Sequence, residues 1–68
     1  MEIPIVINGE ARTVAPRQTL LELLRYLALD PARVAVELDR RIVKQAHWSD
    51  TVVEAGAQIE IVQFVGGG

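Results

Sequence analysis

Three consecutive glycines, Gly66, Gly67 and Gly68, are the residues of this chain that most clearly point to chemistry. Glycine loses more backbone entropy on ordering than any other residue, so three in a row after a strand predict a flexible strap. At about 3.3–3.6 Å per residue, this strap reaches roughly 10 Å. Because it has no Cβ atoms, it can thread a channel too narrow for side chains, and the carbonyl carbon of Gly68 can be approached from either face.

The carboxylate of Gly68 is the group that such a strap presents to a partner. A carboxylate is a poor acyl electrophile, but a partner enzyme can use ATP to convert it to an acyl-adenylate, in which AMP is a good leaving group. A sulfur nucleophile that displaces AMP leaves a thiocarboxylate, and no side chain of the carrier is needed. A frayed terminus is the alternative for any glycine tail. Here the tail follows an apolar strand without a polar linker, which favours a functional tail.

The rest of the chain offers no catalytic set. It has no cysteine, which excludes disulfides, thiolate catalysis and cysteine-based metal sites. Its single histidine, His47, lies in a polar stretch beside Trp48, without a second metal ligand or a triad. The glycines do not form a phosphate loop, because no helix follows them. We therefore expect a protein that is not an enzyme and that binds no metal or cofactor of its own.

The charge of the chain points away from nucleic acid. The formal net charge is −2, and the only basic cluster is Arg40, Arg41 and Lys44, which is expected to be a solvated turn. No apolar run approaches the roughly 20 residues of a membrane span, and residues 1–4 carry no secretion signal. We expect a cytoplasmic protein that contacts neither nucleic acid nor membrane.

A hairpin is predicted at the start of the chain. Alternating isoleucines indicate its first strand: Ile3, Ile5 and Ile7. Asn8-Gly9 then indicates a type I′ turn, because both central residues of that turn need positive φ. A strict two-residue turn pairs Ile7 with Glu10. It also pairs Ile5 with Arg12, which is awkward for a buried face, so a β-bulge is the alternative.

An amphipathic helix is predicted next. Thr19 and Glu22 have the spacing of a capping box, in which each side chain accepts a hydrogen bond from a free N–H at the helix start. One buried stripe follows with helical spacing: Leu20, Leu23, Leu24, Leu27 and Ala28. Pro31 is expected to end the helix at or before Asp30.

Three further strands complete the predicted fold. They are expected over residues 34–38, at 42–43 after a turn at 39–41, and over 58–65, while Trp48 closes one end of the core. One helix must cover one face of one mixed sheet, so the fold class is α+β with two layers and ββαββ order. The sheet has four to five strands. We expect one domain over residues 1–65 and a tail over 66–68.

The last strand is predicted to have two different faces. Ile59 and Ile61 are expected to face the helix, whereas Val62 and Phe64 are expected to face away from it. Apolar side chains on the open face of a sheet favour a surface for a partner protein. The alternative is that Phe64 only caps the end of the sheet.

The chain resembles the ThiS family, the sulfur carriers of thiamin biosynthesis. The likeness covers nearly the whole chain and is most specific at its end. It is carried by Ile7-Asn8-Gly9-Glu10, by residues 19–24 and 34–37, by Trp48 and by residues 59–68. Two segments depart from the family pattern: Asp39-Arg40-Arg41 replaces an Asn-Gly turn, and Lys44-Gln45 replaces a Pro-Arg pair before the tryptophan.

The resemblance implies a ubiquitin-like β-grasp fold and a set of partners. A ThiF-like adenylyltransferase, using ATP and Mg²⁺, would adenylate Gly68. A sulfur donor protein would supply the sulfur of the thiocarboxylate, and a ThiG-like thiazole synthase would receive it. Three alternatives stay open: a small subunit like that of molybdopterin synthase, a ubiquitin-like protein modifier, and a β-grasp interaction domain without tail chemistry.

Overall fold

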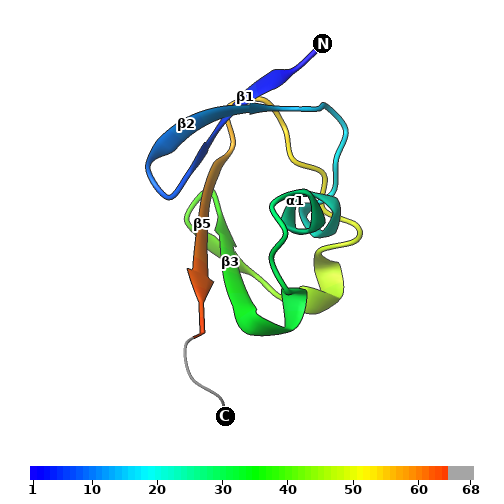
Figure 1. The fold of residues 1–68 in the computed structure, drawn as a ribbon, viewed down its shortest axis with the longest axis vertical. Helices are drawn as coiled ribbons and strands as arrows, with labels where there is room; N and C mark the ends of the chain where they lie inside the picture. Colours follow the sequence, from blue (N-terminus) through cyan, green and yellow to red (C-terminus); the bar gives the residue numbers. More distant parts are fainter. Residues whose placement is uncertain (65–68) are drawn as a thin grey trace.

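Two hairpins and a strand between them build one mixed sheet in the computed structural model, which describes residues 1–64 (Figure 1). The strands are β1 (Ile3–Ile7), β2 (Glu10–Val14), β3 (Val34–Leu38), β4 (Arg41–Val43) and β5 (Gln58–Gln63). Their spatial order is β2-β1-β5-β3-β4, with β5 parallel to β1 and antiparallel to β3. The predicted α+β fold with a mixed sheet is confirmed. The order ββαββ counts only four strands, and the short strand β4 is the fifth.

The first hairpin has the strict two-residue turn rather than a bulge. Asn8 and Gly9 have φ values of 50° and 81°, and the turn pairs Ile7 with Glu10. The pairing of Ile5 with Arg12 is tolerated because β2 is an edge strand, where Glu10 and Arg12 stay exposed. The strand β1 therefore supplies most of the apolar surface that this hairpin gives to the core.

The helix α1 (Leu20–Tyr26) starts as predicted. The Glu22 N–H donates to Thr19 Oγ1 over 3.1 Å, and the Thr19 N–H donates to Glu22 Oε1 over 2.9 Å, which confirms the capping box. Leu20, Leu23 and Leu24 are buried against the sheet.

The end of α1 comes earlier than Pro31 requires. Ala28 has a φ of 61°, its N–H bonds to Arg25 O, and the Leu29 N–H bonds to Leu24 O. These are the two bonds of a Schellman motif, which ends a helix with a left-handed residue, here an alanine instead of the usual glycine. Pro31 instead begins a short 3₁₀ helix, η1 (Pro31–Arg33), in which the Ala32 N–H donates to Asp30 Oδ1 over 3.0 Å.

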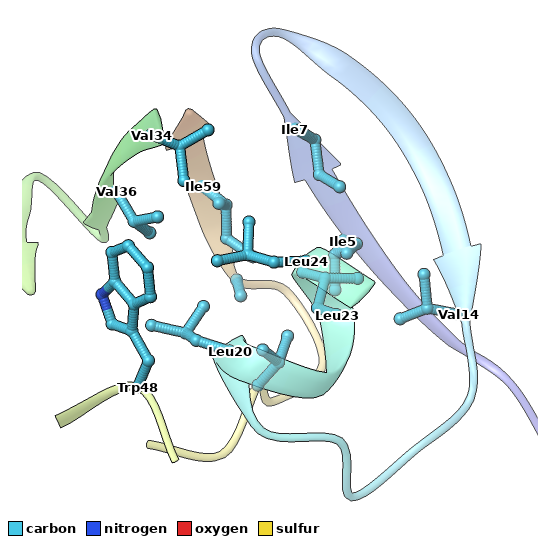
Figure 2. Close-up of a cluster of buried hydrophobic side chains, with 12 residues drawn as sticks. Ile5, Ile7, Val14, Leu20, Leu23, Leu24, Val34, Val36, Trp48 and Ile59 are labelled. Atoms are coloured by element: carbon cyan, nitrogen blue, oxygen red, sulfur yellow. The ribbon is translucent and has the colours of Figure 1, made fainter. Parts of the chain in front are cut away.

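The core lies between α1 and one face of the sheet (Figure 2). Trp48, which follows a second 3₁₀ helix, η2 (Gln45–His47), is only 2% exposed and packs at the edge of this cluster. Its Nε1–H donates to the carbonyl oxygen of Val43 over 2.8 Å. The predicted role of Trp48 in the core is confirmed.

Among the described residues, the helical segments fall short of the length and apolar character that crossing a membrane requires.

Candidate functional site

The predicted reactive tail lies outside the described residues. Gly66, Gly67 and Gly68 therefore stay a sequence prediction, and so does the division of the chain into a domain over 1–65 and a tail over 66–68. The structure describes the segment that leads to them, which is β5 followed by Phe64. This segment is the root of the candidate site.

The strand β5 is held along both of its sides at its start. On one side, the Val6 N–H donates to Ala57 O and the Asn8 N–H donates to Ile59 O, both over 2.9 Å. On the other side, β3 pairs with β5 along its whole length, from Leu38 opposite Ile59 to Val34 opposite Gln63. The central position of β5 fixes the root of the tail to the body of the sheet.

Backbone support on the β3 side continues past the end of the strand. The Phe64 N–H donates to the carbonyl oxygen of Arg33 over 2.8 Å. The extended ladder between the two segments thus reaches the last described residue. A strand is predicted over 58–65. In the structure the regular strand is shorter and ends at Gln63.

The two faces of β5 differ as predicted. Ile59 is buried and Ile61 packs against the core, whereas Val62 and Phe64 are 59% and 55% exposed. Val62 lies opposite Ala35 of β3, and the strongly exposed Ile42 lies on the same open face, opposite Glu37. We call Ala35, Ile42, Val62 and Phe64 the open-face patch. Its role as a partner surface stays a prediction.

Two acidic side chains lie within the open-face patch. Glu37 and Glu60 are directly opposite each other on β3 and β5 and are exposed. Together with Ala35, Ile42 and Val62, they line a shallow depression. Partners that cover this face must therefore meet two carboxylates as well as apolar side chains.

The basic cluster lies on the β3–β4 hairpin, which also carries Ala35 and Ile42 of the open-face patch. Arg40 is in the β3–β4 turn with a φ of 70°, Arg41 is the first residue of β4, and Lys44 directly follows that strand. His47 is exposed. Within residues 1–64, acidic and histidine side chains do not gather into a group of three that a metal ion could use.

Sequence reasoning missed two side chains that hold β5. Asn8 exchanges two hydrogen bonds with the backbone of Ile61, and Asp39 Oδ1 accepts the N–H of Gln58 over 3.0 Å. Both residues are the first of a two-residue turn and have positive φ. The signal that could have found them is the Asn or Asp at this turn position, since both types tolerate left-handed φ and carry a side-chain acceptor.

Comparison with known proteins gives a consistent result along most of the chain. The protein-family model described as "ThiS family" matches residues 5–68 of this chain. The curated "Sulfur carrier protein ThiS" of Escherichia coli is 34% identical over 64 residues, which cover 94% of this chain and 97% of that protein.

A "Thiazole synthase" of Paramagnetospirillum magneticum is 41% identical over 64 residues, and a "Thiazole synthase" of Magnetococcus marinus is 38% identical over 64 residues. Each match covers 94% of this chain but only 20% of the relative. The chain thus spans about a fifth of the length of these two relatives.

Solved structures agree with the fold. The crystal structure of a thiamine biosynthesis protein (ThiS) from Geobacter metallireducens has a TM-score of 0.84 and 30% identity, and the match covers 97% of this chain and 100% of that chain. A designed protein based on human ubiquitin has a TM-score of 0.52 at 20% identity, which shows the ubiquitin-like β-grasp fold alone.

Proposed function

Because this chain belongs to the ThiS family, we propose that it is a sulfur carrier of thiamin biosynthesis whose reactive group is the carboxylate of Gly68. The observation that carries the proposal is the match to the family through residue 68, together with a curated sulfur carrier that this chain covers almost completely. The β-grasp body would hold the root of the tail, and the tail would enter the active sites of partner enzymes.

The proposed chemistry takes place on partner enzymes. The Gly68 carboxylate attacks the α-phosphorus of ATP on a ThiF-like adenylyltransferase that uses Mg²⁺, and pyrophosphate leaves. A sulfur donor protein then delivers sulfur at the oxidation level of sulfide; this sulfur attacks the acyl carbon, AMP leaves, and Gly68 carries a thiocarboxylate. The carrier contributes no catalytic side chain, so it acts as a co-substrate and not as an enzyme. The proposed chemistry consumes ATP, and a chain without cysteine needs no oxidising compartment for its stability, which favours the cytoplasm.

A thiazole synthase is the proposed acceptor of the sulfur. Two relatives that are named thiazole synthase contain a segment like this chain within a chain about five times as long. Linking a carrier to its acceptor raises the effective concentration of one for the other, often to about millimolar for short flexible linkers. This arrangement in the relatives supports a thiazole synthase, rather than molybdopterin synthase or a lysine side chain, as the acceptor.

The open-face patch is the proposed surface for the activating enzyme. Val62 and Phe64 are apolar and exposed; Val62 lies on β5, and Phe64 directly follows that strand on the way to the tail. A partner that covers them has its active site near the root of the tail. Binding there would combine affinity from the patch with entry of the glycines into the active site.

The acceptor can be tested by single-turnover transfer. The thiocarboxylated chain is mixed with a thiazole synthase and its small-molecule substrates, with a molybdopterin synthase large subunit, or with a lysine-containing protein. We expect loss of the sulfur and thiazole formation in the first mixture only. Sulfur transfer to molybdopterin, or an amide bond between Gly68 and a lysine, would contradict the assignment to thiamin biosynthesis.

A further inference from the structure

The strand β5 outruns β1 on one side of the sheet. Pairing between them stops at Ile7 opposite Ile59, because the chain turns away at Asn8-Gly9. Figure 1 shows β5 running past the tip of the β1–β2 hairpin. On the opposite side, β3 accompanies β5 up to Gln63. Among the described elements, no strand lies beside β5 on the β1 side beyond Ile59.

The side chain of Asn8 continues the ladder where the strand β1 has ended. Its Nδ2–H donates to Ile61 O over 3.2 Å, and the Ile61 N–H donates to its Oδ1 over 2.8 Å. A carboxamide has the same donor and acceptor as a peptide group. Asn8 thus supplies both backbone groups of Ile61 with hydrogen bonds, which two successive bonding residues of a continuing parallel strand would otherwise have made. We call this pair of bonds the Asn8 clamp.

We infer that the Asn8 clamp positions the tail, by fixing the direction in which β5 leaves the sheet on the side that has no neighbouring strand. The inference rests on the proposed function, because the tail must bring the Gly68 carboxylate to the α-phosphorus of ATP. Asn8 touches neither group and acts through the backbone of Ile61, so it is a positioning residue. Misplacement of a reacting group by ~1 Å can cost about 100-fold in rate.

The β3–β4 turn provides a matched control for this inference. Asp39 has a φ of 51°, like the 50° of Asn8, and it is also the first residue of a two-residue turn. Its Oδ1 accepts the N–H of Gln58 over 3.0 Å. This bond holds the start of β5, at the end far from the tail. Loss of the Asp39 side chain therefore removes a similar bond but leaves the exit of β5 unchanged.

Asn8→Gly and Asp39→Gly test the inference as a pair. Glycine keeps the positive φ of each turn without strain, so each substitution removes only the side-chain bonds. We expect Asn8→Gly to lower the kcat of thiocarboxylation by about 10-fold and to change the KM for the carrier by less than about twofold. For Asp39→Gly we expect both constants within about twofold of wild type.

Amide hydrogen exchange measures the clamp without any partner enzyme. The Ile61 N–H should exchange faster in Asn8→Gly and keep its wild-type rate in Asp39→Gly. Asn8→Asp retains the acceptor for this N–H, so it should preserve the protection and rescue part of the lost kcat.

Each outcome decides either the inference about Asn8 or the proposed function. If wild type is thiocarboxylated and Asn8→Gly has the same kcat as Asp39→Gly, the inference is wrong. Unchanged exchange of the Ile61 N–H in Asn8→Gly also overturns it, whatever the activity. A rise in KM alone would make Asn8 part of the binding surface and not a positioning residue. If wild type itself is never modified, the proposed function fails, and the inference falls with it.

Discussion

The indole of Trp48 is tied to the edge strand β4, because its Nε1–H donates to the carbonyl oxygen of Val43 over 2.8 Å. The ring is buried in the core, while the neighbouring His47 is exposed. Trp48 thereby connects the loop after β4 to the sheet (Figure 2).

Replacement of Trp48 tests this connection. Trp48→Phe keeps an aromatic ring but loses the hydrogen bond and part of the packing, so we expect the free energy of unfolding to fall by about 1–3 kcal/mol. Urea denaturation followed by circular dichroism measures the change. His47→Ala is the control and should stay within about 0.5 kcal/mol of wild type. Equal stability of Trp48→Phe and wild type would show that the bond contributes nothing.

The capping box of α1 gives a second prediction for stability. Thr19→Ala removes the acceptor for the Glu22 N–H and should lower the free energy of unfolding by about 0.5–2 kcal/mol. Glu22→Gln retains a side-chain oxygen for the Thr19 N–H, so a clearly smaller loss is expected. Thermal and urea denaturation measure both variants. A larger loss for Glu22→Gln than for Thr19→Ala would contradict this account of the helix start.

The third prediction concerns the open-face patch. Val62→Asp and Phe64→Asp place a charge on an apolar surface that the activating enzyme is proposed to cover, so each should raise the Kd for that enzyme by about 10-fold or more. Thr13→Asp is the control, because Thr13 is exposed on the edge strand β2, away from the patch. Calorimetric titration measures Kd, and denaturation confirms folding. Unchanged affinity of folded Val62→Asp and Phe64→Asp would remove the patch from the interface.

Charge gives the fourth prediction. No lysine or arginine follows Lys44, and Glu37 and Glu60 lie within the open-face patch. We expect partner surfaces to be basic, so the association rate should fall as salt rises from roughly 50 to roughly 500 mM, since screening shortens to a few ångströms over this range. Stopped-flow mixing measures the rate. Glu60→Gln should flatten the salt dependence, and a salt-independent rate for wild type would contradict the prediction.

The two ends of α1 show what local sequence can predict. The start depends on side chains three positions apart, Thr19 and Glu22, and such a pair is visible in the sequence. The end depends on Ala28 adopting left-handed φ, which glycine would have signalled and alanine does not. Pro31 set only an outer limit for the helix, and the Schellman motif ends it earlier.

The strand β5 shows both a feature that local sequence predicts and one that it does not. The alternation of Ile59, Ile61 and Val62 predicted which face of β5 is buried, because side chains in a strand alternate. The Asn8 clamp joins residues 53 positions apart, and it exists only because β5 lies beside β1. No local pattern specifies that strand order. The hairpin turn at Asn8 could therefore be predicted from the sequence, but its contact with Ile61 could not.

The central claim, that Gly68 carries the sulfur, is tested most directly by intact mass. The mass of the protein from its native host first tests whether Gly68 bears a free carboxylate. The chain is then incubated with ATP, Mg²⁺, a ThiF-like enzyme and a sulfur donor. We predict a gain equal to the difference between a sulfur and an oxygen atom, placed on Gly68 by fragmentation. Deletion of Gly68 shortens the strap by about 3.3–3.6 Å, so this variant should fold and stay unmodified. No gain in wild type, or an equal gain in the deletion variant, would contradict the account.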